Sequence, residues 1–143
     1  MTNRSFVRVL QVDDFAPWRR FILAKLRQDH SVCVVGTASG SIEAVLKATE
    51  LQPDLILLDI GLPTINGIVA ARQIRAVAPQ AKILFVSQAL DIDVVRIALF
   101  EGGDGYVVKS DADRDLFIAV EAVMRGKKFL SRSVTLASLS ETP

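Results

Sequence analysis

Short apolar runs alternate with longer amphipathic segments along most of the chain. The short runs are rich in β-branched residues, which is typical of strands, and the longer segments repeat apolar residues at helical spacing. The predicted strands are Phe6–Val12, Val32–Thr37, Leu55–Leu58, Ile83–Val86 and Tyr106–Val108. The predicted helices are Pro17–Gln28, Ser41–Leu51, Asn66–Val77, Asp91–Glu101 and Asp113–Arg125. Residues 127–143 show no pattern for a sixth unit.

Strict alternation of strands and helices predicts an α/β fold, in which helices cover both faces of a doubly wound, five-stranded parallel sheet. Two local signals support the helix bounds, because Pro17 suits a first helical turn and Asn66 suits an N-cap position. The second, third and fourth strands are continuously apolar, as expected where both faces of a strand are covered.

The composition is that of one globular domain. The chain has 143 residues, 50% of them hydrophobic, and a net charge of +1, which excludes disorder as the main state. A pI near 7.9 argues against nucleic-acid binding through bulk positive charge. The apolar runs fall far short of the roughly 18 residues of a membrane span, and the N-terminus does not resemble a signal peptide. We therefore expect a cytoplasmic protein, with its single cysteine, Cys33, buried as a small apolar side chain.

Polar side chains stand where the predicted strands end. Asp13 and Asp14 follow the first strand, Asp59 the third, Ser87 the fourth and Lys109 the fifth. Ligands of doubly wound sheets bind outside the carboxyl ends of the strands, so we expect these side chains to share one site.

Three carboxylates in one place repel one another, and a divalent cation such as Mg²⁺ relieves that repulsion through oxygen ligands. A lysine and a hydroxyl nearby add a second positive charge and a hydrogen-bonding partner for a phosphoryl oxygen. Together these groups predict phosphoryl transfer onto an aspartate, a reaction that depends mainly on positioning and charge neutralisation.

These residues resemble the receiver domain of two-component response regulators, a flavodoxin-like fold, over about residues 5–130. The stretch from Ser87 to Ser131 looks most like the NarL/LuxR-type subgroup. The motifs that carry the resemblance are Val12-Asp13-Asp14, Leu57–Pro63 with Gly67, Ser87, and Gly105–Lys109.

The resemblance implies a role for each polar residue of the site. Asp59 is then the phosphoacceptor, and Asp14, Asp59 and the backbone carbonyl of Gly61 bind Mg²⁺, with Asp13 acting through water. Lys109 is expected to bridge Asp59 and the phosphoryl group.

Two further residues are expected to form the switch that the resemblance implies. Ser87 hydrogen-bonds the phosphoryl group and moves toward it, and Tyr106 moves inward with Ser87. A plain strand tyrosine is the alternative for Tyr106.

Three positions depart from the common receiver pattern. Ser110 stands where many receivers have proline after the lysine, so we expect no cis peptide bond there. Gln88 is larger than usual, and Ala89, like Gly61, offers no side chain to orient a hydrolytic water. We therefore expect slow self-dephosphorylation. An unchanged phosphoryl lifetime in Gln88→Ala would show that Gln88 does not contribute to it.

A partner face is expected around the last two helices. Phe100, Tyr106 and Ile118 would form an exposed apolar patch on the face that receivers commonly use to meet partners or to dimerise. The alternative is a wide core-facing stripe of the fifth helix. Trp18, the only tryptophan, is expected to pack in the core.

The domain organisation follows from the same resemblance. Residues 1–126 form a receiver domain, and residues 127–143 a tail or linker stub without an output domain. The expected partner is a histidine kinase or phosphotransfer protein, possibly also a second copy, with no direct nucleic-acid or membrane contact from this chain.

The expected protein is a switch and not a turnover enzyme. One alternative is a pseudo-receiver that works without phosphorylation. Another is a Mg²⁺-dependent aspartyl phosphatase, although its Asp-x-Asp pattern and cap insertion are missing here.

Overall fold

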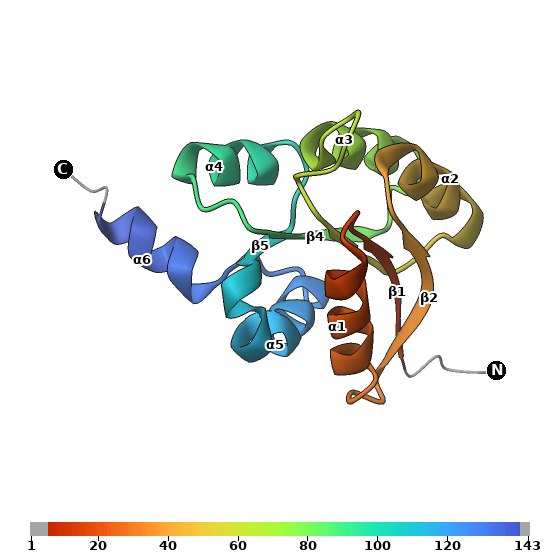
Figure 1. The fold of residues 1–143 in the computed structure, drawn as a ribbon, viewed down its shortest axis with the longest axis horizontal. Coiled ribbons are helices and arrows are strands. Elements are labelled where there is room, and N and C mark those ends of the chain that lie inside the picture. The colour runs from red at the N-terminus through yellow and green to blue at the C-terminus, as the bar shows by residue number, and fades with distance from the viewer. Residues whose placement is uncertain (1–5, 141–143) are drawn as a thin grey trace.

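The computed structural model describes residues 6–140 and has one parallel sheet between two layers of helices (Figure 1). The strand order is β2-β1-β3-β4-β5-β6, so the expected doubly wound α/β fold is confirmed. The strands are β1 Val7–Val12, β2 Val32–Ala38, β3 Leu55–Leu58, β4 Lys82–Ser87, β5 Gly105–Val108 and β6 Phe129–Leu130. The helices are α1 Ala16–Leu26, α2 Ser41–Leu51, α3 Gly67–Val77, α4 Ile92–Phe100, α5 Ala112–Met124 and α6 Arg132–Ser140, with a short 3-10 turn, η1, at Lys109–Asp111.

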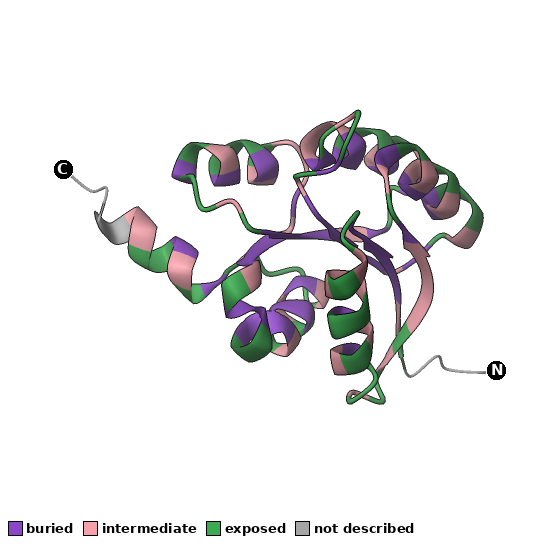
Figure 2. Cartoon of the chain, viewed as in Figure 1, coloured by how far each residue is buried: buried purple, intermediate pink, exposed green. Residues whose placement is uncertain are grey.

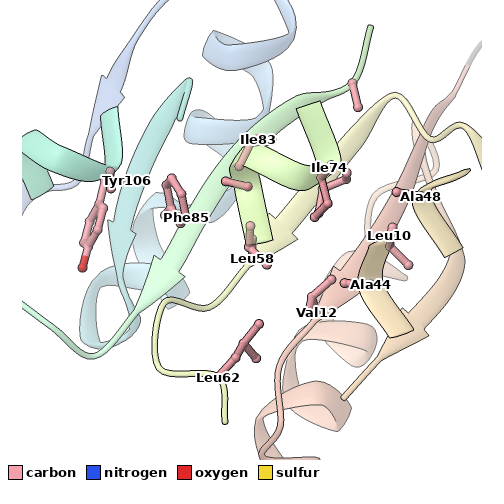
Figure 3. Close-up of a cluster of buried hydrophobic side chains, with 14 of the residues drawn as sticks. Leu10, Val12, Ala44, Ala48, Leu58, Leu62, Ile74, Ile83, Phe85 and Tyr106 are labelled. Carbon is pink, nitrogen blue, oxygen red and sulfur yellow. The ribbon is translucent and has the colours of Figure 1, made fainter. Parts of the chain in front are cut away.

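The central strands are buried on both faces, which is why their sequences are continuously apolar (Figure 2). One face packs against α2, α3 and α4 in a cluster that contains Leu58, Ile74, Phe85 and Tyr106 (Figure 3). The other face packs against α1 and α5 in a cluster that contains Leu116. Packing on both faces of the sheet therefore fixes the positions of the carboxyl ends of its strands.

The predicted caps and breaks are present. The Asn66 side chain caps α3, because its Oδ1 accepts hydrogen bonds from the backbone N–H groups of Ile68 and Val69. Pro17 lies in the first turn of α1. The structure has no cis peptide bond in residues 6–140, in line with the expectation for Ser110.

The expectation that residues 127–143 add no further unit was wrong for the part that the structure describes. Phe129–Leu130 extends the sheet as a sixth strand beside β5, and α6 follows it. Ser131 is fully buried; its N–H donates to the carbonyl of Tyr106, and its Oγ accepts from the N–H of Val108. These contacts satisfy backbone groups at the edge of β5. A strand of two residues has no alternating pattern, so the sequence gives no sign of it.

Cys33 is exposed, contrary to the prediction of a buried thiol. It lies on β2, which is an edge strand of the sheet and is only partly covered. An apolar run in the sequence does not reveal whether its strand is central or at an edge.

The loop between β3 and α3 is held by a close approach at Gly67. A Cβ atom on Gly67 would lie 2.1 Å from the backbone oxygen of Asp59 and 2.7 Å from the Cα of Ile60. The Gly67 N–H donates to the carbonyl of Ile60 at 2.8 Å. Only glycine lets the start of α3 lie against the backbone that carries Asp59.

Candidate functional site

The polar residues that follow the strands converge at one edge of the sheet. Asp13 and Asp14 follow β1, Asp59 follows β3, Ser87 ends β4, and Lys109 follows β5. They surround or adjoin an open hollow of about 440 Å³. Its lining residues are Asp14, Phe15, Asp59, Ile60, Gly61, Ser87, Gln88, Ala89 and Lys109.

Three carboxylates in this site are close enough to share a cation. One oxygen from each of Asp13, Asp14 and Asp59 lies within 4.8 Å of the other two. Asp13 and Asp59 are buried, whereas Asp14 is exposed at the mouth of the site. Hard oxygen donors with an open side toward water fit the preference of Mg²⁺, which usually keeps several of its own waters. The donor set therefore fits a magnesium ion, and Asp14 is the most accessible of the three carboxylates.

Asp13 is the carboxylate most engaged with the protein. Its Oδ1 accepts a hydrogen bond from the backbone N–H of Phe15 at 2.8 Å, and its Oδ2 lies 2.7 Å from the Nζ of Lys109. Burial raises the pKa of Asp13, and the hydrogen bond from Lys109 opposes that rise. Because both of its oxygens already have partners, Asp13 suits the predicted contact with a metal through water.

Lys109 supplies the positive charge of the site. Its Nζ lies 2.7 Å from Asp13 and 3.5 Å from Oδ2 of Asp59, and its side chain is only 11% exposed. The ammonium group therefore lies closer to Asp13 than to the expected phosphoacceptor. A phosphoryl group on Asp59 would offer it new oxygens within the same small space.

The Asp59 carboxylate is oriented by its own loop. Its Oδ1 accepts a hydrogen bond from the N–H of Gly61 at 3.1 Å, while its Oδ2 faces Lys109. Gly61 also lines the hollow, so its backbone is near the carboxylates. Its carbonyl as a metal ligand stays a prediction.

Ser87 and Tyr106 are linked through the residue after Gln88. The Tyr106 hydroxyl donates to the backbone carbonyl of Ala89 at 2.7 Å, and the Ala89 N–H donates to Oγ of Ser87 at 3.3 Å. Tyr106 is fully buried, beside Phe85. The structure thus shows Tyr106 in an inward position. Ala89 connects Tyr106 to Ser87 through its backbone groups, so no pattern of side chains in the sequence could reveal this connection.

We expect Tyr106 to make the protein's stability fall at alkaline pH. Burial raises the pKa of Tyr106 from its ordinary 10.0 to about 12. The folded state therefore favours the protonated ring. This contribution is fully present below pH 10 and is lost as the pH rises through 12, at about 1.4 kcal/mol per pH unit in between.

Tyr106 is the only tyrosine of the chain, so the absorbance of tyrosinate reports on it alone. Titration of the folded protein should give a midpoint well above that of the unfolded chain. Denaturation from pH 9 to 12 should show a weaker pH dependence in Tyr106→Phe. Equal dependence in parent and variant would refute the assignment.

The three residues of the expected partner face do not form one surface. Phe100 and Ile118 are exposed, at 88% and 57%, but Tyr106 is fully buried, in a cluster that includes Val134 of α6. Phe100 lies on α4 and Ile118 on α5, which cover opposite faces of the sheet (Figure 1). Ile118 lines a hollow with Asp29 and other residues near β2. The core-facing residues of α5 include Leu116, Val120 and Val123, as their spacing predicts.

Two aromatic residues of the site were not expected to be part of it. Phe15, which is 60% exposed, lines the hollow beside Asp14. Trp18 packs against the α1–α5 cluster, as expected, but its ring also lies under the ammonium of Lys109. Gln88 is exposed and lines the same hollow. The adjacency of Phe15 to Asp14 in the sequence could have indicated that Phe15 lies at the site. The contact between Trp18 and Lys109 joins segments far apart in the sequence, so no local pattern indicates it.

A larger hollow of about 660 Å³ lies along β2, between α1 and Lys47. None of Asp13, Asp14 and Asp59 lines it, and its size alone indicates no chemistry. The smaller hollow is the candidate site because acidic, basic and hydroxyl groups meet there.

The chain matches a known family over most of its length. The model of the family described as "Response regulator receiver domain" matches residues 9–121. The response regulator protein VraR of Staphylococcus aureus is 34% identical over 128 residues, which cover 90% of this chain and 61% of VraR. The chain thus spans about three-fifths of the length of this curated relative.

Two solved structures are similar over most of the chain. A two-component response regulator of the LuxR family from Aurantimonas sp. has a TM-score of 0.90 at 29% identity, covering 96% of this chain and 98% of that one. RcsB of Salmonella enterica serovar Typhimurium, bound to promoter rprA with the phosphomimetic BeF₃⁻, has a TM-score of 0.83 at 26% identity, covering 91% of this chain and 66% of RcsB. Separately, none of the helices within residues 6–140 is long and apolar enough to cross a membrane. By its sequence match and its fold, the chain belongs to the response regulator receiver domain family.

Proposed function

We propose that this chain is a phosphorylation-dependent switch that accepts a phosphoryl group on Asp59 with the help of Mg²⁺. Receivers of two-component systems are signalling switches and not turnover enzymes, and the chain belongs to that family. The observation that carries the proposal is the meeting of three carboxylates with Lys109 around Asp59.

The reaction is a displacement at phosphorus. An oxygen of Asp59 forms the new bond to phosphorus, while the bond from phosphorus to the donor nitrogen or oxygen breaks and its electron pair leaves with the donor. Asp14, Asp59 and the carbonyl of Gly61 would hold Mg²⁺, with Asp13 acting through water. The ion, when bound, neutralises charge on the phosphoryl oxygens.

Lys109 and Ser87 then hold the product. The ammonium of Lys109 lies 3.5 Å from Asp59 and can pair with a phosphoryl oxygen, and the Ser87 hydroxyl lines the same hollow. A shift of Ser87 would reach Tyr106 through Ala89, because the Ala89 N–H donates to Ser87 and the Ala89 carbonyl accepts from Tyr106. We propose this chain of contacts as the route from phosphorylation to partner preference.

The similarity to VraR and to a LuxR-family regulator supports membership of the NarL/LuxR-type subgroup. We propose a histidine kinase or a phosphotransfer protein as the donor, a cytoplasmic location, and a possible homodimer. The promoter-bound RcsB is longer than this chain, which spans 66% of it. RcsB therefore has residues beyond the part that matches this chain, and these can make the contact with the promoter. We propose that this chain itself makes no direct contact with nucleic acid.

Phosphoryl uptake with and without metal tests the proposal. Incubation with acetyl phosphate and Mg²⁺ should add one phosphoryl group to the intact mass, and a chelator should prevent the gain. Steady turnover of a small phosphate ester would instead indicate a phosphatase. No gain at any Mg²⁺ concentration would favour a pseudo-receiver that works without phosphorylation.

A further inference from the structure

The indole of Trp18 lies beside the cation of the candidate site. Trp18 is on α1 and Lys109 follows β5, yet the Nζ of Lys109 is 5.0 Å from the centre of the Trp18 ring. This distance is within the range of cation–π attraction, which is strongest for tryptophan and grows when the cation is removed from water. The Lys109 side chain is only 11% exposed.

The surroundings of the two side chains separate this contact from ordinary core packing. Trp18 and Lys109 share the walls of a hollow of about 340 Å³, together with Phe15, Gln88 and Ser110. Trp18 is only partly buried, so its ring is not enclosed by the core. Its ring also lies near that of Phe21, at 5.1 Å between centres.

We propose that Trp18 is a positioning residue for Lys109, holding the ammonium group beside Asp59 for phosphoryl transfer. The inference rests on the proposed function and adds to it a residue of α1. It predicts that removing the aromatic face slows phosphorylation even when the fold is intact.

The need for a neutral partner follows from the charges of the site. Lys109 is held mainly by Asp13, at 2.7 Å, and more loosely by Asp59, at 3.5 Å. Both carboxylates belong to the set that fits a divalent cation, so metal binding weakens their attraction for the ammonium and adds repulsion between the cations. The indole face carries no formal charge and does not compete for the metal. It can therefore keep Lys109 in place when the carboxylates hold it less strongly.

Three variants test the proposal. Trp18→Leu removes the aromatic face, and Trp18→Phe keeps a weaker one. Phe21→Leu is the matched control, because it removes an aromatic ring from the same helix, and Phe21 does not line the hollow that Trp18 shares with Lys109. The first readout is the NMR position of the Lys109 ε-methylene protons in the metal-free protein. The second is the rate of phosphorylation by acetyl phosphate with Mg²⁺, at a temperature where every variant is folded.

We expect upfield-shifted Lys109 resonances in the parent and in Phe21→Leu, a smaller shift in Trp18→Phe, and none in Trp18→Leu. Phosphorylation should slow about 3- to 10-fold in Trp18→Leu and about 2-fold in Trp18→Phe, and stay within about 2-fold of the parent in Phe21→Leu. Unshifted Lys109 resonances in a parent that is phosphorylated, or equal rates in Trp18→Leu and the parent, would overturn the role of Trp18. A parent with shifted resonances that takes up no phosphoryl group would overturn the proposed function itself.

Discussion

Replacing Lys109 with methionine is expected to slow phosphorylation by acetyl phosphate about 10²- to 10³-fold. Methionine fills much of the same space without a charge. The variant therefore lacks the ammonium group that lies 3.5 Å from Asp59 and that would meet a phosphoryl oxygen. A loss of this size is typical when one pre-positioned donor is removed from a site where charge develops.

The same variant should bind Mg²⁺ several-fold more tightly, because Lys109 no longer competes for Asp13, 2.7 Å away, or repels the metal. Opposite changes in metal affinity and phosphorylation rate distinguish a catalytic loss from a misfolded site. Metal titration and intact mass against time measure the two.

Lys25→Met is the matched control for Lys109→Met. Lys25 also pairs with an aspartate, Asp113 at 2.9 Å, and lies 5.6 Å from the Phe117 ring, but it is outside the site. It should leave both quantities within about 2-fold of the parent. Weaker Mg²⁺ binding or an unchanged rate in Lys109→Met would contradict the role given to Lys109.

Replacing Gly67 with alanine is expected to lower the free energy of unfolding by about 2–3 kcal/mol and to impair phosphorylation as well. The added Cβ would lie 2.1 Å from the backbone oxygen of Asp59 and 2.8 Å from its carbonyl carbon. Both are backbone atoms, so no side chain can turn away to make room. The loop must move, and with it the carboxylate of Asp59.

Chemical denaturation of Gly67→Ala should be compared with that of Gly61→Ala from the same loop. A Cβ on Gly61 would meet only the Asp59 carboxylate oxygens, at 3.9 and 4.0 Å. That variant should stay within about 0.5 kcal/mol of the parent in stability. Equal stability of the two variants would show that the loop accommodates a side chain at position 67.

The fold could be predicted where burial leaves a clear pattern in the sequence. β3, β4 and β5 are covered on both faces, so their residues had to be apolar, and their helices follow at regular intervals. The short strand β6 was not predicted, because it has only two residues and is followed by a serine, Ser131, whose buried hydroxyl contacts a backbone group of β5. The exposure of Cys33 was missed for a related reason, since the position of β2 at the sheet edge is set by topology.

The residues of the candidate site were predicted because the strands of a parallel sheet end at the same edge. Their detailed contacts were not. The contact of Lys109 with Trp18 joins η1, which follows β5, to α1. The hydrogen bond of Tyr106 uses a backbone carbonyl group, which every residue carries. The expected partner face failed to form one surface because Tyr106 lies inside the protein, in a cluster that includes Val134 of the unpredicted α6.

Intact mass of the parent and of Asp59→Asn, after incubation with Mg²⁺ and acetyl phosphate, tests the central claim most directly. Asp93→Asn is the control, because its carboxylate is 83% exposed on α4 and does not line the hollow that contains Asp59. We predict a gain of one phosphoryl group in the parent and in Asp93→Asn, and none in Asp59→Asn. An equal gain in Asp59→Asn, or no gain in the parent, would contradict the assignment of Asp59 as the phosphoacceptor.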